Sequence, residues 1–221
     1  MQLFTRLFAA GVCCSSLVTS IASADFVNPL MPTWRGTTAS DFYGWESFTS
    51  AFGGPNLPNY TGTESAAALF NFGPGAFLTG TGNLYGGGGP LSISIFGGLT
   101  GDVSEVILNL STIGTGVNLS SIRFSIFDNS GGSAVLTANS SELRSDTPAP
   151  GGQGQVQTWA LSWTIPTQSF QSTRFVVDFA STTSNMSLDA VSLDMQYTPA
   201  PGALALIAIS GVTARARRRR A

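Results

Sequence analysis

The chain has 221 residues, of which only 10% are charged, against about 25% in typical soluble proteins. It contains no histidine and no lysine, which excludes histidine general bases, histidine metal sites and lysine Schiff bases. Between Asp25 and Thr198, four arginines and twelve acidic residues give a net charge of −8, which disfavours binding to nucleic acid.

The first 24 residues have the three-part pattern of a secretory signal peptide. Arg6 supplies a short positive region, residues 7–21 are mostly apolar, and small residues at Ala22 and Ala24 precede the predicted cleavage site before Asp25. An N-terminal membrane anchor is the alternative. The apolar run of 15 residues is shorter than the ~20 that span a bilayer, which favours a signal helix that is removed.

The two cysteines of the chain, Cys13 and Cys14, lie inside this segment. Their removal with the signal peptide would leave a mature protein without thiols, disulfides or cysteine metal sites. A lipoprotein signal is the alternative interpretation, but Val12 directly before Cys13 matches it poorly.

Residues 26–60 are rich in aromatic side chains among Gly, Pro and Thr. The aromatic residues on which the interpretation depends are Trp34, Phe42, Tyr43, Trp45, Phe48 and Phe52. One hypothesis is an aromatic surface for sugar rings, with Trp34 and Trp45 as glycan contacts. The other is an irregular lid over one face of the domain, which is favoured because aromatic residues mostly serve to bury area.

The rest of the domain alternates between apolar and polar residues with the period of a β-strand. In residues 120–128, for example, Ile122, Phe124 and Ile126 share one face and Arg123 the other. The segments with such patterns are 91–96, 105–110, 120–128, 133–138, 157–165, 174–179 and 187–197. A weaker one, 66–72, fits a short helix as well because of its alanine run.

Glycine-rich turns separate these segments, and residues 147–152 form a longer loop that we expect to be exposed. Seven or eight short strands spaced by turns predict an all-β domain over residues 25–198, an antiparallel β-sandwich of jelly-roll type. An immunoglobulin-like arrangement is the alternative, but the chain lacks its Cys…Trp…Cys pattern. Residues 187–193 resemble the last strand of carbohydrate-binding jelly rolls.

Little in the sequence indicates catalysis. Glycoside hydrolysis needs two carboxylates, and Asp178, Asp189 and Asp194 lie near predicted strand ends or on outer strand faces. Isolated acids there are usually solvated, so we predict no enzyme and no cofactor. Loops rich in Asp and Asn have the oxygen ligands that Ca²⁺ prefers, but no calcium-loop motif is present.

The C-terminal segment, residues 199–221, has three parts. Pro199, Ala200 and Pro201 precede an apolar stretch, residues 202–214, which is predicted to form a short helix. An arginine cluster follows, made of Arg215, Arg217, Arg218, Arg219 and Arg220. Thirteen helical residues reach about 20 Å, less than the hydrocarbon core of about 30 Å, and the arginines should stay on the cytoplasmic side.

This order of parts resembles the PEP-CTERM sorting signal, with Ala200 in place of the glutamate of the family motif. The resemblance implies processing by an exosortase-type membrane protease in Gram-negative bacteria that make exopolysaccharide. A plain C-terminal membrane anchor is the alternative. Residues 33–36 and 43–48 also resemble the N-terminal segments of proteins with such tails.

The sequence therefore predicts an exported protein that is cleaved by signal peptidase, inserts transiently in the inner membrane, is cut by an exosortase-like enzyme and reaches the cell surface or medium. Its expected function is structural or adhesive, in the extracellular matrix of a biofilm. The alternative is a carbohydrate-binding module for exopolysaccharide, and a remote alternative is a glycoside-active enzyme.

Overall fold

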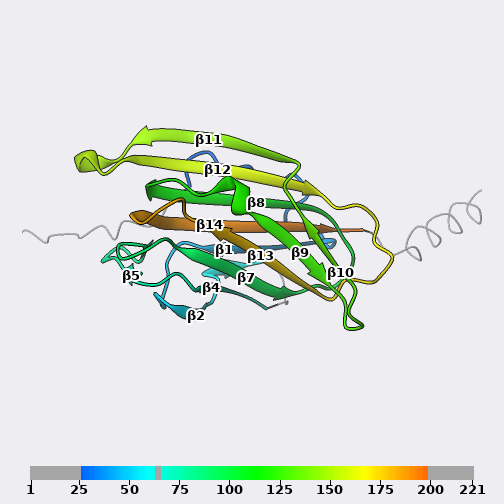
Figure 1. Cartoon of the computed structure of the whole chain (residues 1–221). Coiled ribbons are helices and arrows are strands. Elements are labelled where there is room, and N and C mark those ends of the chain that lie inside the picture. Colours follow the sequence, from blue (N-terminus) through cyan, green and yellow to red (C-terminus); the bar gives the residue numbers. More distant parts are fainter. Residues whose placement is uncertain (1–25, 63–65, 199–221) are drawn as a thin grey trace, which may run out of the picture.

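A computed structural model describes residues 26–62 and 66–198 of the chain. Four predicted features lie outside these residues: the signal cleavage site at Ala22, Ala24 and Asp25, the motif Pro199–Ala200–Pro201, the terminal arginine cluster and both terminal helices. The described part is built almost wholly from antiparallel strands, arranged in two sheets (Figure 1).

The larger sheet has the strand order β11, β12, β8, β14, β1, β3. Their bounds are β11 Ser140–Pro148, β12 Gln155–Thr164, β8 Val103–Gly114, β14 Met186–Tyr197, β1 Ser40–Trp45 and β3 Tyr60–Thr61. Two short strands extend it: β6 (Leu84–Tyr85) pairs with the start of β14, and β5 (Phe77–Leu78) pairs with β6.

The smaller sheet has the order β10, β9, β13, β7, β4, β2. Their bounds are β10 Ser133–Leu136, β9 Arg123–Phe127, β13 Arg174–Ala180, β7 Ser92–Gly98, β4 Ala67–Asn71 and β2 Gly53–Asn56. Two single-turn 3₁₀ helices, η1 (Leu119–Ser121) and η2 (Pro150–Gly152), lie in connections between strands.

The connectivity is that of a jelly roll. From β7 onwards the chain crosses between the sheets repeatedly, from β7 to β8, β8 to β9, β10 to the β11–β12 hairpin, β12 to β13 and β13 to β14. The last strand, β14, returns between β1 and β8, while β13 returns between β9 and β7. The predicted β-sandwich of jelly-roll type is confirmed, and the strand order differs from the immunoglobulin-like alternative.

The core lies between the inner faces of the two sheets. Large side chains from both sheets meet there: Phe124 of β9 packs against Phe175 of β13 and Trp163 of β12, with ring centroids 6.1 Å apart in each case. The alternation predicted from sequence supplies these residues, because every second side chain of a strand points to the same face. The core therefore forms from the segments in which apolar and polar residues alternate most regularly.

The strand expected at 66–72 is confirmed and its short-helix alternative is not, since β4 lies there with alternate residues such as Leu69 buried. Two other expectations need correction. Strand β1 lies inside the segment expected to be an irregular lid, and it pairs with β14 along its full length. Strand β11 extends through Pro148 into the loop expected at 147–152.

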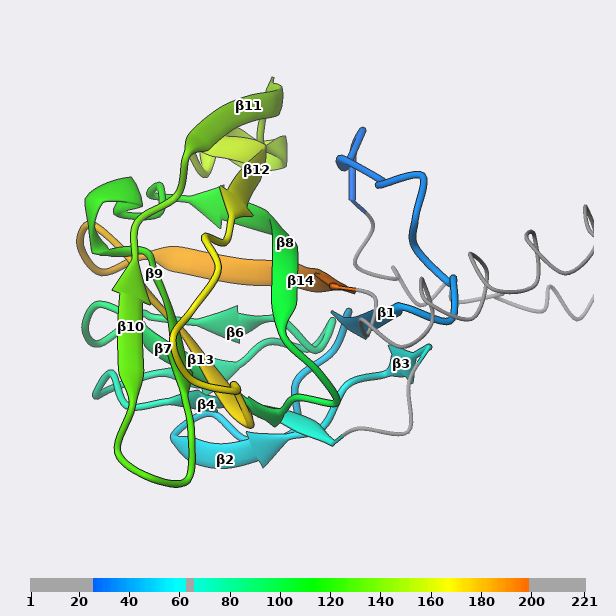
Figure 2. The same cartoon turned by 90° about the vertical axis from the view of Figure 1, so that its right-hand side faces the viewer.

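The lid expectation holds for residues 26–39, which lie against the outer face of the larger sheet (blue in Figure 2). The side-chain amide of Asn109 on β8 binds this segment twice, accepting from the Leu30 N–H at 2.8 Å and donating to the Leu30 carbonyl at 3.1 Å. Arg35 makes a two-pronged ion pair with Asp194 of β14. We call residues 26–39 the cover segment.

Candidate functional site

A cleft lies on the outer face of the larger sheet, near the start of β14. Strand β14 pairs with β1 over Val191–Gln196, but its first residues pair with β6. Four residues lie opposite one another on neighbouring strands: Ile113 on β8, Ser187 on β14, Tyr85 on β6 and Phe77 on β5. Residues opposite one another share a face, so these four side chains project to the same side of the sheet.

The β5–β6 hairpin forms one wall. Its turn is closed by hydrogen bonds from Thr79 N–H to the Asn83 carbonyl at 2.9 Å and from Gly82 N–H to the Thr79 carbonyl at 3.0 Å. Gly82 has φ +90°, a conformation that glycine adopts without steric cost. The turn brings the hydroxyls of Thr79 and Thr81 within 2.9 Å of each other, and Thr81 donates to the Asn83 amide oxygen at 3.2 Å.

A side-chain hydrogen bond fixes this hairpin to the rest of the sheet. Asn83 is buried and donates through Nδ2 to Oδ1 of Asp189 at 2.8 Å. The second carboxylate oxygen of Asp189 accepts from the Ser111 hydroxyl at 3.1 Å. Asp189 thus links the β5–β6 turn to β8 through hydrogen bonds, and it is not among the residues that line the cleft.

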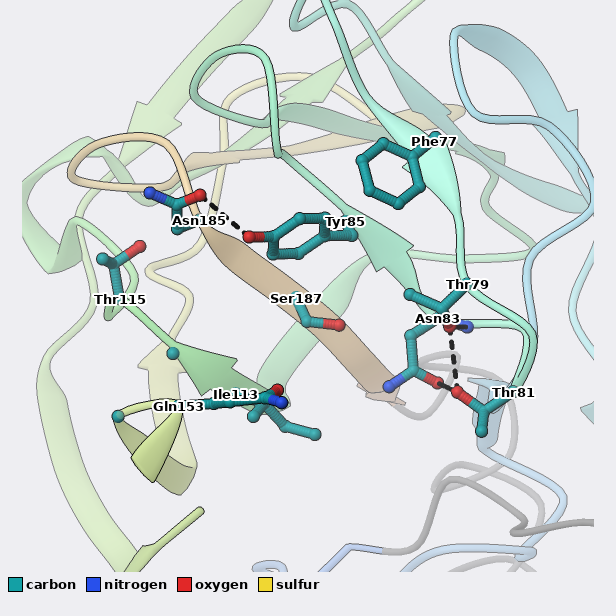
Figure 3. Close-up of a pocket in the computed structure, with 12 residues that line it drawn as sticks. Phe77, Thr79, Thr81, Asn83, Tyr85, Ile113, Thr115, Gln153, Asn185 and Ser187 are labelled. Atoms are coloured by element: carbon teal, nitrogen blue, oxygen red, sulfur yellow. Dashed lines mark hydrogen bonds between the residues drawn. The ribbon is translucent and has the colours of Figure 1, made fainter. Parts of the chain in front are cut away.

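The opposite wall comes from the end of β8, the β13–β14 turn and the loop after η2. Gly114 has φ +94°, and a Cβ atom there would lie 2.4 Å from the carbonyl oxygen of Asn185, so only glycine fits. Asn185 itself has φ +70°, which asparagine tolerates better than most residues. Its side-chain oxygen accepts from the Tyr85 hydroxyl at 2.8 Å, joining the two walls (Figure 3).

The cleft has a volume of about 770 Å³, within the usual range for ligand sites. Its lining consists of Phe77, Thr79, Thr81, Asn83, Tyr85, Ile113, Gly114, Thr115, Gln153, Gly154, Asn185 and Ser187. None of these side chains is charged. Phe77 is 51% exposed and meets Tyr85 edge to face, with ring centroids 5.0 Å apart. Figure 3 shows these rings on one side of the cleft and Ile113 and Gln153 on the other.

The two tryptophans proposed as glycan contacts lie away from this cleft. Trp45 is completely buried in the core, where its Nε1–H donates to the Asn56 carbonyl at 3.0 Å. It is therefore inaccessible to a glycan, which corrects the expectation. Trp34 is half-buried in the cover segment and donates to the Glu105 carboxylate at 3.2 Å.

The three acids singled out from sequence do not form an exposed pair. Asp178 lies on the smaller sheet, whereas Asp189 and Asp194 lie on β14 of the larger one and are buried. Burial raises the pKa of Asp194 above its ordinary value of 3.8, and the Arg35 guanidinium offsets this only in part. Their arrangement does not place two carboxylates across a cleft, as glycoside hydrolysis requires.

Sequence reasoning missed the cleft because it assigned no strand to residues 76–85. A signal was present: Phe77-Leu78 and Leu84-Tyr85 flank a Thr-Gly-Thr-Gly-Asn run, which is typical of a short hairpin. What the sequence could not supply was the partner, since Tyr85 pairs with Ser187 about a hundred residues further on.

Within residues 26–62 and 66–198 there is no cluster of three or more acidic, histidine or cysteine side chains that could hold a metal ion. No helix in the same ranges is long and apolar enough to cross a membrane. A scan against protein-family models, a search of curated proteins and a search of solved structures each gave no match.

Proposed function

We propose that the sandwich is a non-catalytic module that binds a neutral saccharide in the cleft between β5, β6, β8 and β14. The observation that carries the proposal is the lining: seven aliphatic side chains with hydroxyl or amide groups, the two aromatic rings of Phe77 and Tyr85, and no charge. Sugar hydroxyls both donate and accept hydrogen bonds, as these side chains do. The exposed ring of Phe77 offers an apolar surface for the C–H face of a pyranose.

Other ligand classes fit this lining less well. A phosphate or carboxylate ligand would lack a cationic partner, because no arginine lines the cleft. A wholly apolar ligand would leave hydroxyl and amide groups such as those of Thr79, Gln153 and Ser187 without the water that otherwise solvates them. A neutral polyhydroxylated ligand can hydrogen-bond to the hydroxyl and amide groups and pack its C–H face against the aromatic rings.

We further propose that the whole protein is exported and has a structural or adhesive role. The support is the sequence at both ends: the signal pattern before Asp25 and the Pro-x-Pro, apolar and arginine-rich segment after Thr198. The intact mass of the protein recovered from cell surface and medium tests it. Loss of residues 1–24 and of the C-terminal segment is expected, and an uncleaved C-terminus held in the inner membrane would contradict it.

The binding proposal is tested by native-gel affinity electrophoresis of the full chain in gels containing neutral polysaccharides, such as dextran, laminarin, galactomannan and xylan. At least one should retard the protein. Phe77→Ala should then weaken retardation about tenfold, a size common for an aromatic binding anchor. Gln153→Ala should also weaken it by removing an amide on the other wall.

Phe52→Ala is the matched control, because Phe52 is 64% exposed but does not line the cleft. Thermal unfolding of each variant checks that it remains folded. Wild-type binding by both cleft variants, or no retardation by any neutral polysaccharide of the panel, would show that the cleft is not a saccharide site.

A further inference from the structure

The outer face of the smaller sheet is aromatic and uncovered. One register row across β4, β7, β13, β9 and β10 carries Ala68, Phe96, Val176, Ser125 and Val135. Of these, Phe96 is 41% exposed and Val135 65%. These strands are in clear view in Figure 1, and the cover segment lies at the opposite sheet in Figure 2.

Further phenylalanines continue this face. Phe70 meets the Phe96 ring edge to face, with centroids 5.4 Å apart, and stacks on Phe72 at 6.1 Å. Phe72 is 50% exposed. Soluble domains rarely leave contiguous rings of this kind in water, so the face fits an interaction site better than a solvent-facing surface.

A hollow of about 240 Å³ interrupts the face between Phe96 and Phe127. Arg174, which lines the hollow, lies opposite Gly98 on β7, where an added Cβ would meet nothing within 4 Å. The Arg174 guanidinium stacks over the Phe127 ring, with its central carbon 5.8 Å from the centroid. An arginine is thus held at the edge of an aromatic hollow.

The arginines of this face differ from those of the larger sheet. Two of the four arginines in the described chain, Arg35 and Arg144, are engaged in ion pairs on the larger sheet. Arg123 and Arg174 make no ion pair with any described residue, and both project from the outer face of the smaller sheet. Two acids lie near them. Asp178 is opposite Arg123 and accepts the Ser94 hydroxyl at 2.5 Å, and Asp128 follows β9, where its carbonyl accepts from Arg174 at 3.4 Å and its carboxylate binds backbone N–H groups of its own turn.

We propose that this face binds an acidic polysaccharide, with a uronate ring packed between Phe96 and Phe127 and its carboxylate held by Arg174. Arg174 is a cation without an ion pair among the described residues, in a domain whose net charge is −8 between residues 25 and 198. An anionic ring is therefore attracted to Arg174, whereas the excess of acids on the domain as a whole repels it elsewhere. The planar guanidinium matches a carboxylate with two parallel hydrogen bonds.

The proposal does not depend on the neutral-saccharide cleft, which lies on the other sheet. The test is affinity electrophoresis of the full chain in gels containing polygalacturonate at low and at high salt, with dextran gels in parallel. Polygalacturonate should retard the wild-type protein. Arg174→Gln should weaken retardation about tenfold at low salt and much less at about 1 M salt, where charges are screened within about 3 Å. Phe96→Ala should weaken it at both salt concentrations.

Two controls isolate the face. Arg144→Gln changes the net charge by the same amount as Arg174→Gln but at the edge of the larger sheet, and Phe77→Ala removes an exposed ring from the cleft. Both should bind polygalacturonate like wild type, whatever they do to neutral saccharides. Equal binding by all four variants would overturn the proposal. So would a dimer in sedimentation equilibrium that Phe96→Ala dissociates while polygalacturonate has no effect on the wild type.

Discussion

Replacing Arg35 by alanine should destabilise the fold strongly, because it leaves a buried carboxylate without its partner. Asp194 has no exposed surface, and Arg35 donates to both of its oxygens, through Nη2 to Oδ2 at 2.6 Å and through Nε to Oδ1. Removal of one member of a buried ion pair typically costs about 3–5 kcal/mol. Domains of this size are stable by about 5–15 kcal/mol, so the loss should be a large part of the total.

The loss should also depend on pH in a defined direction. Burial already raises the pKa of Asp194 in the folded protein, and Arg35 opposes that rise. Without Arg35 the folded state holds the Asp194 proton more tightly than the unfolded state does. Acid therefore favours the folded variant, and the cost of Arg35→Ala should be largest at neutral pH and shrink as the pH falls toward the ordinary pKa of 3.8.

Urea unfolding followed by tryptophan fluorescence measures both effects, at neutral pH and near pH 5. The double variant Arg35→Ala/Asp194→Asn should be more stable than Arg35→Ala at neutral pH, since an amide tolerates burial better than an unpaired charge. Arg144→Ala is the control, because its partner Glu142 is 60% exposed and such pairs contribute about 0.2–1 kcal/mol. A loss below about 1 kcal/mol for Arg35→Ala, or a larger loss that is the same at both pH values, would refute the argument.

Two further predictions concern single residues. Gly114→Ala should cost about 2–3 kcal/mol in urea unfolding, because φ is +94° and the new Cβ would lie 2.4 Å from the Asn185 carbonyl, whereas Gly98→Ala, with open space at its Cβ, should cost nothing measurable. Burial and the nearby Glu46 raise the pKa of Tyr60 to about 12, so its contribution to stability, complete below pH 10, is lost as the pH rises through about 12. Ultraviolet titration of tyrosinate should show this late step, Tyr60→Phe should remove it, and Glu46→Gln should move it toward 10.

The sequence predicted the strands whose residues alternate between apolar and polar. Strand β13 is an example, because Phe175, Val177 and Phe179 are buried and the residues between them are not. Strand β14 was predicted as well, although both its faces are buried, because its polar residues still alternate with its apolar ones. Strand β1 escaped prediction because aromatic residues stand on both its faces: Tyr43 points into the core, and Phe42 lies under Arg35 of the cover segment at 5.3 Å.

Strand β11 escaped for the opposite reason. It is the edge strand beyond β12, and most of its residues are exposed on both faces. Its sequence Ser-Ser-Glu-Leu-Arg-Ser-Asp-Thr-Pro is accordingly polar except at Leu143 and Pro148 and shows no alternation. The tryptophan hypothesis failed on a related point. Aromatic residues indicate burial or binding, and only the pairing of β1 with β14 decides that Trp45 is in the core. The cleft residues are joined by pairings across the whole chain, which no local pattern records.

The outer faces of the two sheets differ in a way that core stability does not require. Residues 26–39 contact the outer face of the larger sheet at β8 and β14, and another part of that face holds a cleft whose rings and amides are neutral. The smaller sheet has no such cover in the described chain, and its exposed rings are accompanied by Arg123 and Arg174. Phenylalanines that remain half-exposed gain little from folding, so their presence is better explained by a partner than by packing. With one proposed surface on each sheet, a single domain could hold a neutral and an acidic polysaccharide chain at once. Cross-linking of this kind is what a structural or adhesive role in an extracellular matrix demands, and it needs neither catalysis nor a metal.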